Sequence, residues 1–298
     1  MLGIVLINYK NEEEIIHYIQ HELSGIELPH NIVIVDNSCD ESSISKLESE
    51  LTIREISNGI DKSSNLFLID AKGNLGYARA NNLGAQFLKD NFECKYILFS
   101  NSDIHFDKKD VLSPLIEKLG LNDRISAINP MIIDENFNYQ SPMIEISIWK
   151  LYISRFLFYP ITRKISPIVN NAPEGEYGRL MGCFLLVRAC DFFEVDMFDN
   201  NTFLYGEELI LSEKFRKIGK VSYYLPTCKI YHQQSSTIKN FLSEKKQIAM
   251  MAKSEFYFYK KYKNVNQLTV LLASFSMIVY LYFYLPLKLF LRYLKNEF

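Results

Sequence analysis

The sequence has few cysteines, and they follow no pattern. It contains five in 298 residues, an odd number without paired metal-ligand spacing or the density of a disulfide framework. They stand at Cys39, Cys94, Cys183, Cys190 and Cys228. This excludes a disulfide-stapled scaffold and a zinc site built from cysteines, and it fits a reducing cytosol.

An excess of charge of either sign is also missing. Lysine and arginine total 33 against 35 acidic residues, so the chain lacks the strong field and the basic stripe that attract nucleic acid. The N-terminal stretch MLGIVLINYKNEEE has no basic region before its short apolar run, which is not typical of a secretory signal. The chain does have 48% hydrophobic residues, enough for one large core or one domain with an appendage.

Four short apolar runs of strand length occupy the first hundred residues. They are LGIVLI from Leu2, IVIV from Ile32, LFLI from Leu66 and YILF from Tyr96. Helical patterns lie between some of them; in NEEEIIHYIQHEL, Asn11 can cap a helix whose Ile15 and Ile19 share one face. This alternation, with strands that are apolar on both faces, predicts an α/β fold with a parallel sheet.

Polar residues follow each of these runs. They are Asn8, Asp36, Asp70, and Asn101 with Asp103. In an open α/β sheet the ligand crevice lies beyond the carboxyl ends of the strands. Four polar ends on one edge therefore indicate a binding site, although turn residues repeated four times give the same pattern.

The third run leads into DAKGNLGYARANNLGAQFL. Gly73 and Gly76 allow close approach of the backbone, and the helix that follows offers free amides to an anion, with Arg79 adding a positive charge. The spacing matches neither the dinucleotide fingerprint nor the phosphate loop of ATPases. A nicotinamide enzyme and a phosphate-loop ATPase are therefore not supported.

The second half of the chain holds further candidates. FLYGEELILSEKFRKIGK predicts a helix from near Glu207 to a residue before Gly219, and Glu208 falls on its apolar side. A carboxylate there needs a charge, a metal or a substrate as partner, whereas the helix dipole alone accounts well for Glu207. His232 ends a strand-like run and is either structural or a ligand. Gly182 either allows a sugar to lie against the backbone or is merely structural.

Seven segments together resemble the inverting glycosyltransferases of family 2, in particular the rhamnosyltransferase-like branch that builds bacterial surface polysaccharides. They are VLINYKN, IVDNS, GNLGYARANNLG, FSNSDI, GCFLLVR, FLYGEELIL and His232 ahead of SST. The resemblance covers about Leu2 to Tyr262. It implies the GT-A fold, an α/β fold whose mostly parallel central sheet is flanked by helices and joins a nucleotide-binding half to an acceptor half.

The resemblance also implies a nucleotide-diphosphate sugar donor and a divalent cation, Mg²⁺ or Mn²⁺. By match to the motifs, Asp36 contacts the base, the GNLG segment with Arg79 lies near ribose and diphosphate, and Asp103 holds the metal, with His232 as a second ligand. The donor-binding residues implied in this way are Asn8, Asp36, Asn37, Gly73, Asn74, Gly76, Arg79, Asn82, Asn101 and Gly182.

Two positions depart from the family pattern. Many relatives have Asp-x-Asp where this chain has Asn101 and Asp103, yet magnesium accepts one or two protein carboxylates because water and phosphate oxygens complete its octahedron. In GEELIL, Glu208 stands where relatives place the catalytic aspartate, and Ile210 replaces a second aspartate. The resemblance implies Glu208 as the catalytic base, with the adjacent Glu207 as the other catalytic candidate.

A long stretch near the C-terminus contains no charged residue, from Asn264 to Leu287. It is long enough to span a bilayer, but basic residues flank it on both sides, which favours a helix lying in the membrane interface over a span. A buried core helix remains the alternative. We expect a catalytic domain over 1–235, a helical connector over 236–263 and a membrane-associated segment over 264–298.

The resemblance therefore implies an inverting transferase that moves rhamnose from dTDP-rhamnose to a polyprenyl-linked saccharide at the cytoplasmic face of the cell membrane, in capsule or O-antigen synthesis. A family 2 enzyme using a UDP-sugar (galactose, galactofuranose or an N-acetylhexosamine) is one alternative. A catalytically silent homologue that binds nucleotide sugars is another, since Asn101 and Ile210 depart from the pattern. A nucleotidyltransferase is disfavoured because NYKNEEE is not a glycine-rich basic loop.

Overall fold

The computed structural model describes residues 1–296 except 62, 109, 155–157, 159–165 and 234–243, and the chain divides into two units. The first consists of Met1–Met143 and Ile168–Thr237, and the second of Ile144–Pro167 and Ile238–Phe298. Residues Ile144–Pro167, which the expected boundaries include in the catalytic domain, group with the C-terminal helices. The SST segment after His232 lies outside the described residues.

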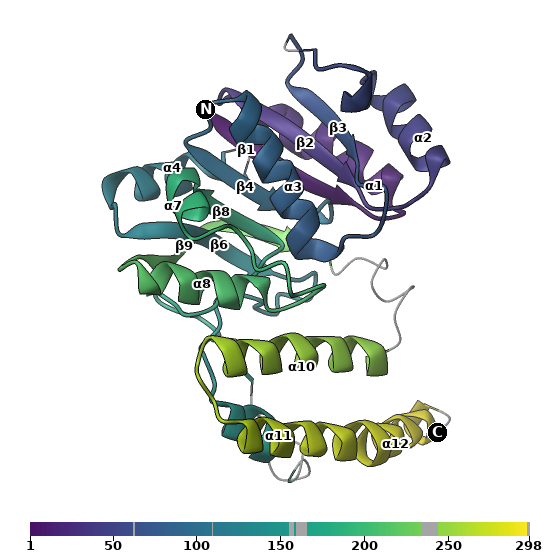
Figure 1. Ribbon diagram of the computed structural model, residues 1–298, viewed down its shortest axis with the longest axis vertical. Helices are drawn as coiled ribbons and strands as arrows, with labels where there is room; N and C mark the ends of the chain where they lie inside the picture. Colours follow the sequence, from purple (N-terminus) through teal and green to yellow (C-terminus); the bar gives the residue numbers. More distant parts are fainter. Residues whose placement is uncertain (62, 109, 155–157, 159–165, 234–243, 297–298) are drawn as a thin grey trace. The chain divides into compact units, whose positions relative to one another are not determined.

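The first unit is a sheet with helices on both faces (Figure 1). Its strands are β1 (Leu2–Asn8), β2 (His30–Asp36), β3 (Leu66–Asp70), β4 (Tyr96–Ser100), β5 (Ile104–Phe106), β6 (Ile125–Ile133), β7 (Gly175–Glu176), β8 (Phe184–Arg188) and β9 (Val221–His232). Its helices are α1 (Glu12–His17), η1 (Tyr18–Glu22), η2 (Leu23–Gly25), α2 (Glu41–Leu51), η3 (Ile56–Asn58), α3 (Gly76–Asn91), α4 (Leu112–Leu121), α7 (Ala189–Glu194) and α8 (Glu207–Lys217).

The strands are ordered β3-β2-β1-β4-β8-β6-β9-β5, and β7 pairs with β9. The first four strands are parallel to one another, as their apolar character predicts. β8 is antiparallel to both of its neighbours, while β6 and β9 are again parallel. The sheet is therefore mixed, and its parallel part carries the strand ends singled out by the sequence.

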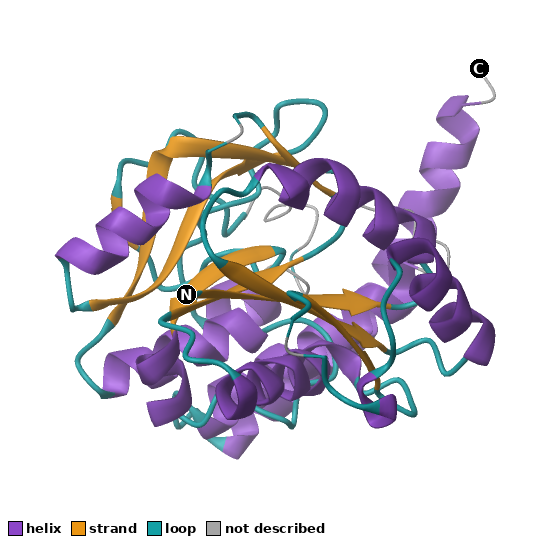
Figure 2. Ribbon diagram, turned by 90° about the horizontal axis from the view of Figure 1, so that it is seen from above, coloured by secondary structure: helices purple, strands orange, loops and turns teal. Residues whose placement is uncertain are grey.

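Helices lie on both sides of the sheet (Figure 2), and alternate residues of the strands belong to two hydrophobic cores, one on each face. Ile4 and Leu6 of β1 pack with Ile15 of α1 and with side chains of α2 and α4. Val5 faces the other way, toward α3, α7 and α8. Both faces are thus covered, which accounts for the lack of polar alternation in the early strands.

The helical pattern after β1 forms, but not as one regular helix. α1 ends at His17 and continues as the π-helical turn η1 and the short 3₁₀ turn η2. Asn11 occupies the N-cap position without a capping bond from its side chain, contrary to expectation. Asn8 Oδ1 instead accepts the Asn11 backbone amide at 3.2 Å, which ties the start of the helix to the end of β1.

The second unit is helical. It consists of η4 (Trp149–Ser154), α10 (Glu244–Lys261), α11 (Gln267–Val279), η5 (Tyr280–Tyr284) and α12 (Leu285–Asn296). α11 packs against both η4 and α10 (Figure 1). Inside this unit the Tyr152 hydroxyl donates to the buried Glu255 Oε2 at 2.5 Å, which satisfies a carboxylate among apolar neighbours.

Candidate functional site

The polar strand ends meet at one edge of the sheet. In the parallel register Asn8 is opposite Asp36, and Asp36 is opposite Asp70. Ser100 at the end of β4 is opposite Leu6, so the segment from Asn101 to Asp103 continues along the same edge. The structure therefore brings these residues together as the strand pattern predicts.

Asp36 is buried, and its two carboxylate oxygens differ in their environment. Oδ1 accepts hydrogen bonds from Asn8 Nδ2 at 2.7 Å, Ser38 Oγ at 2.7 Å and Ser43 Oγ at 3.1 Å. Oδ2 is equally buried and receives no hydrogen bond from any described residue. Burial raises the pKa of Asp36, and the bonds from Ser38 and Asn8 oppose that rise. One oxygen is thus anchored and the other is available to a ligand.

This network gives Asn8 a supporting role, whereas the resemblance implies that it binds the donor directly. Asn8 is fully buried and holds Asp36, so it acts behind the binding surface. Ser38 and Ser43 share that task, and sequence reasoning missed both. Ser38 belongs to the IVDNS motif, so its role could have been predicted from the sequence. Ser43 lies in the first turn of α2, and no sequence motif marks it.

The GNLG segment lies beside the end of β2. Asn37 Nδ2 donates to the Gly76 carbonyl at 3.4 Å, and Asn74 Oδ1 accepts the Gly76 amide at 3.0 Å. Asn37 Oδ1 is buried and receives no hydrogen bond from a described residue. Gly76 has a φ of +76° and begins α3, while Gly73 is free of close contacts at its Cα. This turn is therefore tied to Asn37, the residue that follows Asp36.

Arg79 and Asn82 of α3 are engaged elsewhere in the structure. Arg79 is exposed, and its Nε donates to the Asn200 carbonyl at 2.9 Å. Asn82 is buried, donates to the Phe198 carbonyl at 2.9 Å and accepts the Phe198 amide at 3.0 Å. Both side chains tie α3 to the loop before α8. The structure does not bring Asn82 to the strand ends.

Asp103 and His232 face each other in the interior. Asp103 Oδ1 lies 3.3 Å from His232 Nε2, and both side chains are buried. Gln140 fixes the imidazole: its Nε2 donates to the His232 carbonyl at 3.2 Å, which turns its Oε1 toward His232 Nδ1 at 2.6 Å. Nδ1 therefore carries a hydrogen, and Nε2 is directed at Asp103. Gln140 was not found from the sequence, because nothing in its local pattern marks it.

The electrostatics of this pair favour a positive charge. Burial by itself lowers the pKa of His232, but Cys183 and Asp103 outweigh that effect and raise it to about 11. The pair also affects Glu14 of α1: burial, followed by the charge of Asp103, raises the pKa of Glu14 to about 7. Within the described ranges, no group of three His, Cys, Asp or Glu side chains forms a ready metal cage.

Glu207 and Glu208 begin α8, as the sequence predicts, and both are buried. Glu208 Oε1 lies 3.6 Å from Arg179 Nε. Oε1 of Glu207 receives no hydrogen bond from a described residue, and burial together with Glu208 raises the pKa of Glu207. Arg179, from the loop between β7 and β8, is a further residue that the sequence did not reveal.

Gly182 lies directly beside this acidic pair. The Tyr77 hydroxyl donates to the Gly182 carbonyl at 2.6 Å. A methyl group on Gly182 would stand 3.7 Å from the Tyr77 hydroxyl and 3.8 Å from Glu208 Oε2. The glycine therefore leaves space next to the carboxylate that a side chain would occupy. Tyr77, Gly182 and Glu208 join three of the sequence motifs at one point.

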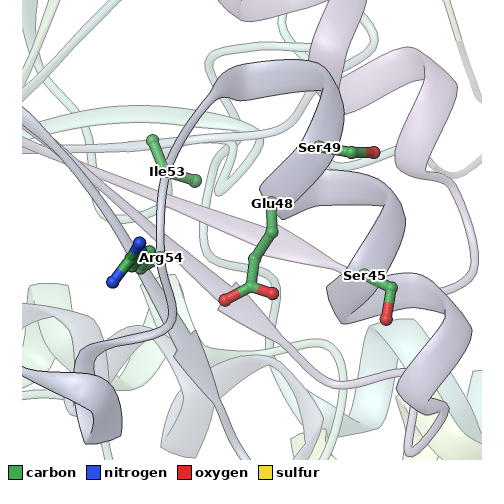
Figure 3. A pocket seen from close by; sticks show the side chains of 5 residues that line it. All are labelled: Ser45, Glu48, Ser49, Ile53 and Arg54. Carbon is green, nitrogen blue, oxygen red and sulfur yellow. The ribbon is translucent and has the colours of Figure 1, made fainter.

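A cavity elsewhere in the first unit does not belong to this group. It lies beside α2 and the loop that follows, and it is lined by Ser45, Glu48, Ser49, Ile53 and Arg54 (Figure 3). Glu48 Oε1 accepts the Glu55 amide at 2.8 Å, so this carboxylate has a structural task. The cavity contains none of the residues that the sequence marks as functional.

Comparison with known sequences identifies relatives. The family described as "Glycosyl transferase family 2" matches residues 4–172. An N-acetylglucosaminyl-diphospho-decaprenol L-rhamnosyltransferase from Mycobacterium tuberculosis is 22% identical over 248 residues, 79% of this chain and 76% of that protein. The low-salt glycan biosynthesis hexosyltransferase Agl10 from Haloferax volcanii is 28% identical over 133 residues. That alignment spans 45% of this chain and only 37% of the archaeal protein.

Comparison with solved structures identifies the fold. A mannosyltransferase from Pyrobaculum calidifontis, solved with GDP-mannose and Mn²⁺, superimposes with a TM-score of 0.58 at 10% identity over 95% of this chain and 70% of that one. GalNAc-T7, solved with UDP, GalNAc and Mn²⁺, gives 0.54 at 15% identity over 89% of this chain and 51% of that one. The chain has the GT-A fold.

Proposed function

The chain belongs to glycosyl transferase family 2, and from that premise we propose that it is an inverting, metal-dependent transferase that moves rhamnose from dTDP-rhamnose to a polyprenyl-linked saccharide. The observation that carries the proposal is the position of Glu208, a buried carboxylate beside the open face of Gly182 on the sheet edge that also holds Asp36 and Asp103. The rhamnosyltransferase relative supports the sugar and the lipid-linked acceptor.

The donor base is assigned to the end of β2. Thymine and uracil each carry an imide N–H, and the buried Oδ2 of Asp36 is an acceptor without a bond from any described residue. A buried acceptor of this kind costs free energy until a donor reaches it. The same argument holds for dTDP and for UDP, so a UDP-sugar is the second candidate donor. The neighbouring turn with Gly73 and Gly76 then lies near ribose and diphosphate.

Asp103 and His232 fit a divalent cation. They present one oxygen and one nitrogen 3.3 Å apart, and a cation bound there would replace the proton that Cys183 and Asp103 favour on His232. Mg²⁺ and Mn²⁺ sites of this kind use one or two protein side chains, with phosphate oxygens and water completing the shell. A bound cation would supply neutralisation of the negative charge that develops on the departing diphosphate. Gln140 would hold His232 in the ligating tautomer.

Glu208 would act on the acceptor. As the acceptor hydroxyl oxygen forms its bond to the anomeric carbon, Glu208 takes the hydroxyl proton, and the bond from that carbon to the diphosphate oxygen breaks. Attack from the side opposite the leaving group inverts the anomeric configuration. The space beside Gly182 admits the hydroxyl next to the carboxylate.

The second unit would bring this chemistry to a membrane. Gln267–Phe290 is a helical stretch long and apolar enough to cross a bilayer, and 44% of its most apolar window is buried against other helices. Most of its exposed side chains are large and apolar. These large apolar side chains are Leu268, Leu271, Leu272, Phe275, Ile278, Tyr282, Phe283, Leu287, Leu289 and Phe290, here called the apolar stripe.

The position of α10 beside this helical stretch favours a helix that lies in the plane of the membrane. α10 packs against α11. At the edge of the apolar stripe, Lys245 Nζ lies 3.5 Å from the centre of the Tyr282 ring, and Glu244 pairs with Lys288 at 3.3 Å. A spanning orientation would carry the charged residues of α10 into hydrocarbon, which is costly. An in-plane orientation buries the apolar stripe in lipid and leaves α10 in water.

Charge points to an anionic membrane. Residues 244–296 contain nine lysines and arginines and two glutamates, whereas the whole chain has a formal net charge of −2. The positive charge is therefore concentrated in the unit that carries the apolar stripe. Anionic lipid attracts such a segment by about 1 kcal/mol per basic residue near the surface.

A donor screen tests the proposed function. Purified protein is heated with dTDP-rhamnose, UDP-sugars and GDP-mannose, with and without Mn²⁺, and slow donor hydrolysis is followed by release of the nucleoside diphosphate. A ligand at a hundred times its dissociation constant stabilises the fold by about 2.7 kcal/mol. We expect the largest Mn²⁺-dependent shift and hydrolysis with dTDP-rhamnose. Binding without hydrolysis or transfer would favour the silent homologue, and a preference for GDP-mannose would contradict the proposed donor.

A further inference from the structure

Two adjacent carboxyl groups are buried at the start of α8, and Arg179 is the cation placed against them. Arg179 Nε lies 3.6 Å from Glu208 Oε1, and each of these two side chains is 11% exposed. This separation is longer than a hydrogen bond, so the contact is electrostatic. Glu208 therefore keeps lone pairs for another partner, such as a hydroxyl group.

The backbone around Arg179 is held on both sides. The Met143 amide donates to the Arg179 carbonyl at 2.9 Å. Two residues further on, the Met181 amide donates to Asn129 Oδ1 at 2.7 Å, and Asn129 Nδ2 donates to the Met181 carbonyl at 3.2 Å. The loop from Arg179 to Gly182 is thus pinned to β6 and to the segment after it. It presents the guanidinium and the open glycine from one fixed stretch of chain.

The pair cannot easily carry two negative charges. Two negative charges on neighbouring buried residues disfavour each other. Glu207 is the more buried member; burial followed by the charge of Glu208 raises its pKa, and Arg179 opposes that rise only in part. The tyrosines that face the pair, Tyr77 of α3 and Tyr205 of the preceding loop, also have raised pKa values and stay neutral. Arg179 is the permanent charge that decides between the two carboxyl groups.

We propose that Arg179 is a positioning residue that assigns the negative charge of the pair to Glu208 and leaves the proton on Glu207. The inference rests on the proposed function, in which an ionised Glu208 accepts the proton of the acceptor. Without the guanidinium, the proton is shared between the two carboxyl groups, and a smaller fraction of the protein has Glu208 ready at neutral pH.

The test compares Arg179→Gln and Arg179→Lys by the pH dependence of kcat/KM for the acceptor. An opposite charge at 4–6 Å lowers a carboxyl pKa by roughly 1–3 units. We therefore expect Arg179→Gln to move the acid limb of the kcat/KM profile to higher pH by at least about 1 unit. At pH values below the limb, kcat/KM should then fall roughly 10-fold, whereas on the alkaline plateau it should stay within a few-fold of the unmodified protein. Arg179→Lys keeps the charge and should hold the limb near its original position.

The matched control is Arg124→Gln, which removes an arginine from an exposed pair with Glu176 at 3.3 Å in the same unit. It should leave the profile unchanged. An equal loss at every pH in Arg179→Gln, with an unmoved acid limb, would show a merely structural role and overturn the inference.

A second measurement does not depend on turnover. Carboxyl ¹³C NMR of glutamate-labelled protein, assigned with Glu207→Gln and Glu208→Gln, follows the two groups directly. We expect Glu208 to ionise at lower pH than Glu207 in the unmodified protein and to rise in Arg179→Gln. The reverse order in the unmodified protein overturns the inference even if the variants do not fold. If Glu208 ionises at lower pH than Glu207 but the protein turns over no donor, the proposed function is wrong and the inference about Arg179 still holds.

Discussion

The Tyr77 amide donates a hydrogen bond to the Phe203 carbonyl at 2.7 Å, and this bond joins the GNLG turn to the loop that precedes Glu207. The two segments are far apart in the sequence, yet the donor-side turn and the start of the catalytic helix share this contact. Gly76 makes it possible, because its φ of +76° turns the chain and its missing side chain lets Phe203 approach. The geometry of one motif therefore depends on the other.

Gly76→Ala should destabilise the protein. A methyl group there would clash with the Phe203 carbonyl oxygen, in a backbone conformation unsuited to L residues. The left-handed backbone costs about 1–2 kcal/mol and the lost hydrogen bond about 1 kcal/mol. Urea unfolding measures the change. Gly73→Ala is the control, since nothing lies within 4 Å of its added methyl, and it should stay within about 0.5 kcal/mol. Equal effects would mean that the turn is not packed on Phe203.

Asp103→Asn should abolish the Mn²⁺ dependence of donor binding, measured by calorimetry, because it removes the carboxylate that faces His232. Gln140→Leu should weaken Mn²⁺ binding less, by ~10–100-fold, since it only releases the imidazole orientation. Asp107→Asn is the matched control: this carboxylate is exposed and pairs with Lys229 at 2.9 Å. Unchanged Mn²⁺-dependent affinity in Asp103→Asn would refute the metal assignment.

Much of the fold follows from the sequence because its signals are local. Apolar runs, their polar ends and the helix start at Glu207 are all readable within a few residues, and parallel pairing then aligns Asn8 with Asp36. The insertion of β8 between β4 and β6 is not readable, because it depends on pairing between distant segments. The same limit applies to the second unit, in which residues 144–167 join helices that come a hundred residues later.

The candidate site likewise combines features that the local sequence predicts with features that depend on distant segments. Motif residues reach the expected edge of the sheet, but their tasks depend on partners that no local pattern reveals. Asn82 belongs to the GNLGYARANNLG motif, yet its amide is taken up by the backbone of Phe198, 116 residues away. Gln140 and Arg179 show the converse, since they lie outside every motif and still orient His232 and face Glu208. Side-chain pairing across loops decides these roles.

Phe275→Glu and Phe283→Glu, singly or together, should release the protein from anionic vesicles. Their rings are 59% and 71% exposed on the apolar stripe, so a charge there would enter lipid without disturbing the packed face. Vesicle flotation measures the bound fraction, with neutral vesicles expected to bind less. The control is Leu121→Glu, which charges a 78% exposed leucine at the end of α4 in the other unit. Equal binding by all variants would show that the stripe has another partner.

Glu208→Gln should lower sugar transfer with donor affinity nearly unchanged. General-base catalysis contributes typically ~10²–10⁴-fold, and glutamine keeps the shape of the side chain but accepts no proton. Glu207→Gln should cost distinctly less, because Glu207 already carries a proton in the arrangement described above. Steady-state transfer rates and calorimetric donor binding measure both. A reversed order would make Glu207 the base, and losses of only a few-fold in both would place the base outside α8.

Glu207→Gln should also change how stability depends on pH. Burial, followed by the charge of Glu208, raises the pKa of Glu207 from 4.5 to about 8 in the folded chain. Between these values the folded state binds more protons than the unfolded state, so the free energy of unfolding falls as pH rises through this window. Glutamine has no such dependence. The stability of Glu207→Gln relative to the unmodified protein should therefore grow between pH 5 and pH 9, by urea unfolding at each pH. Glu117→Gln, an exposed change on α4, should show a constant difference. A constant difference for Glu207→Gln as well would mean that Glu207 is ionised in the folded protein, and the proton would then belong to Glu208.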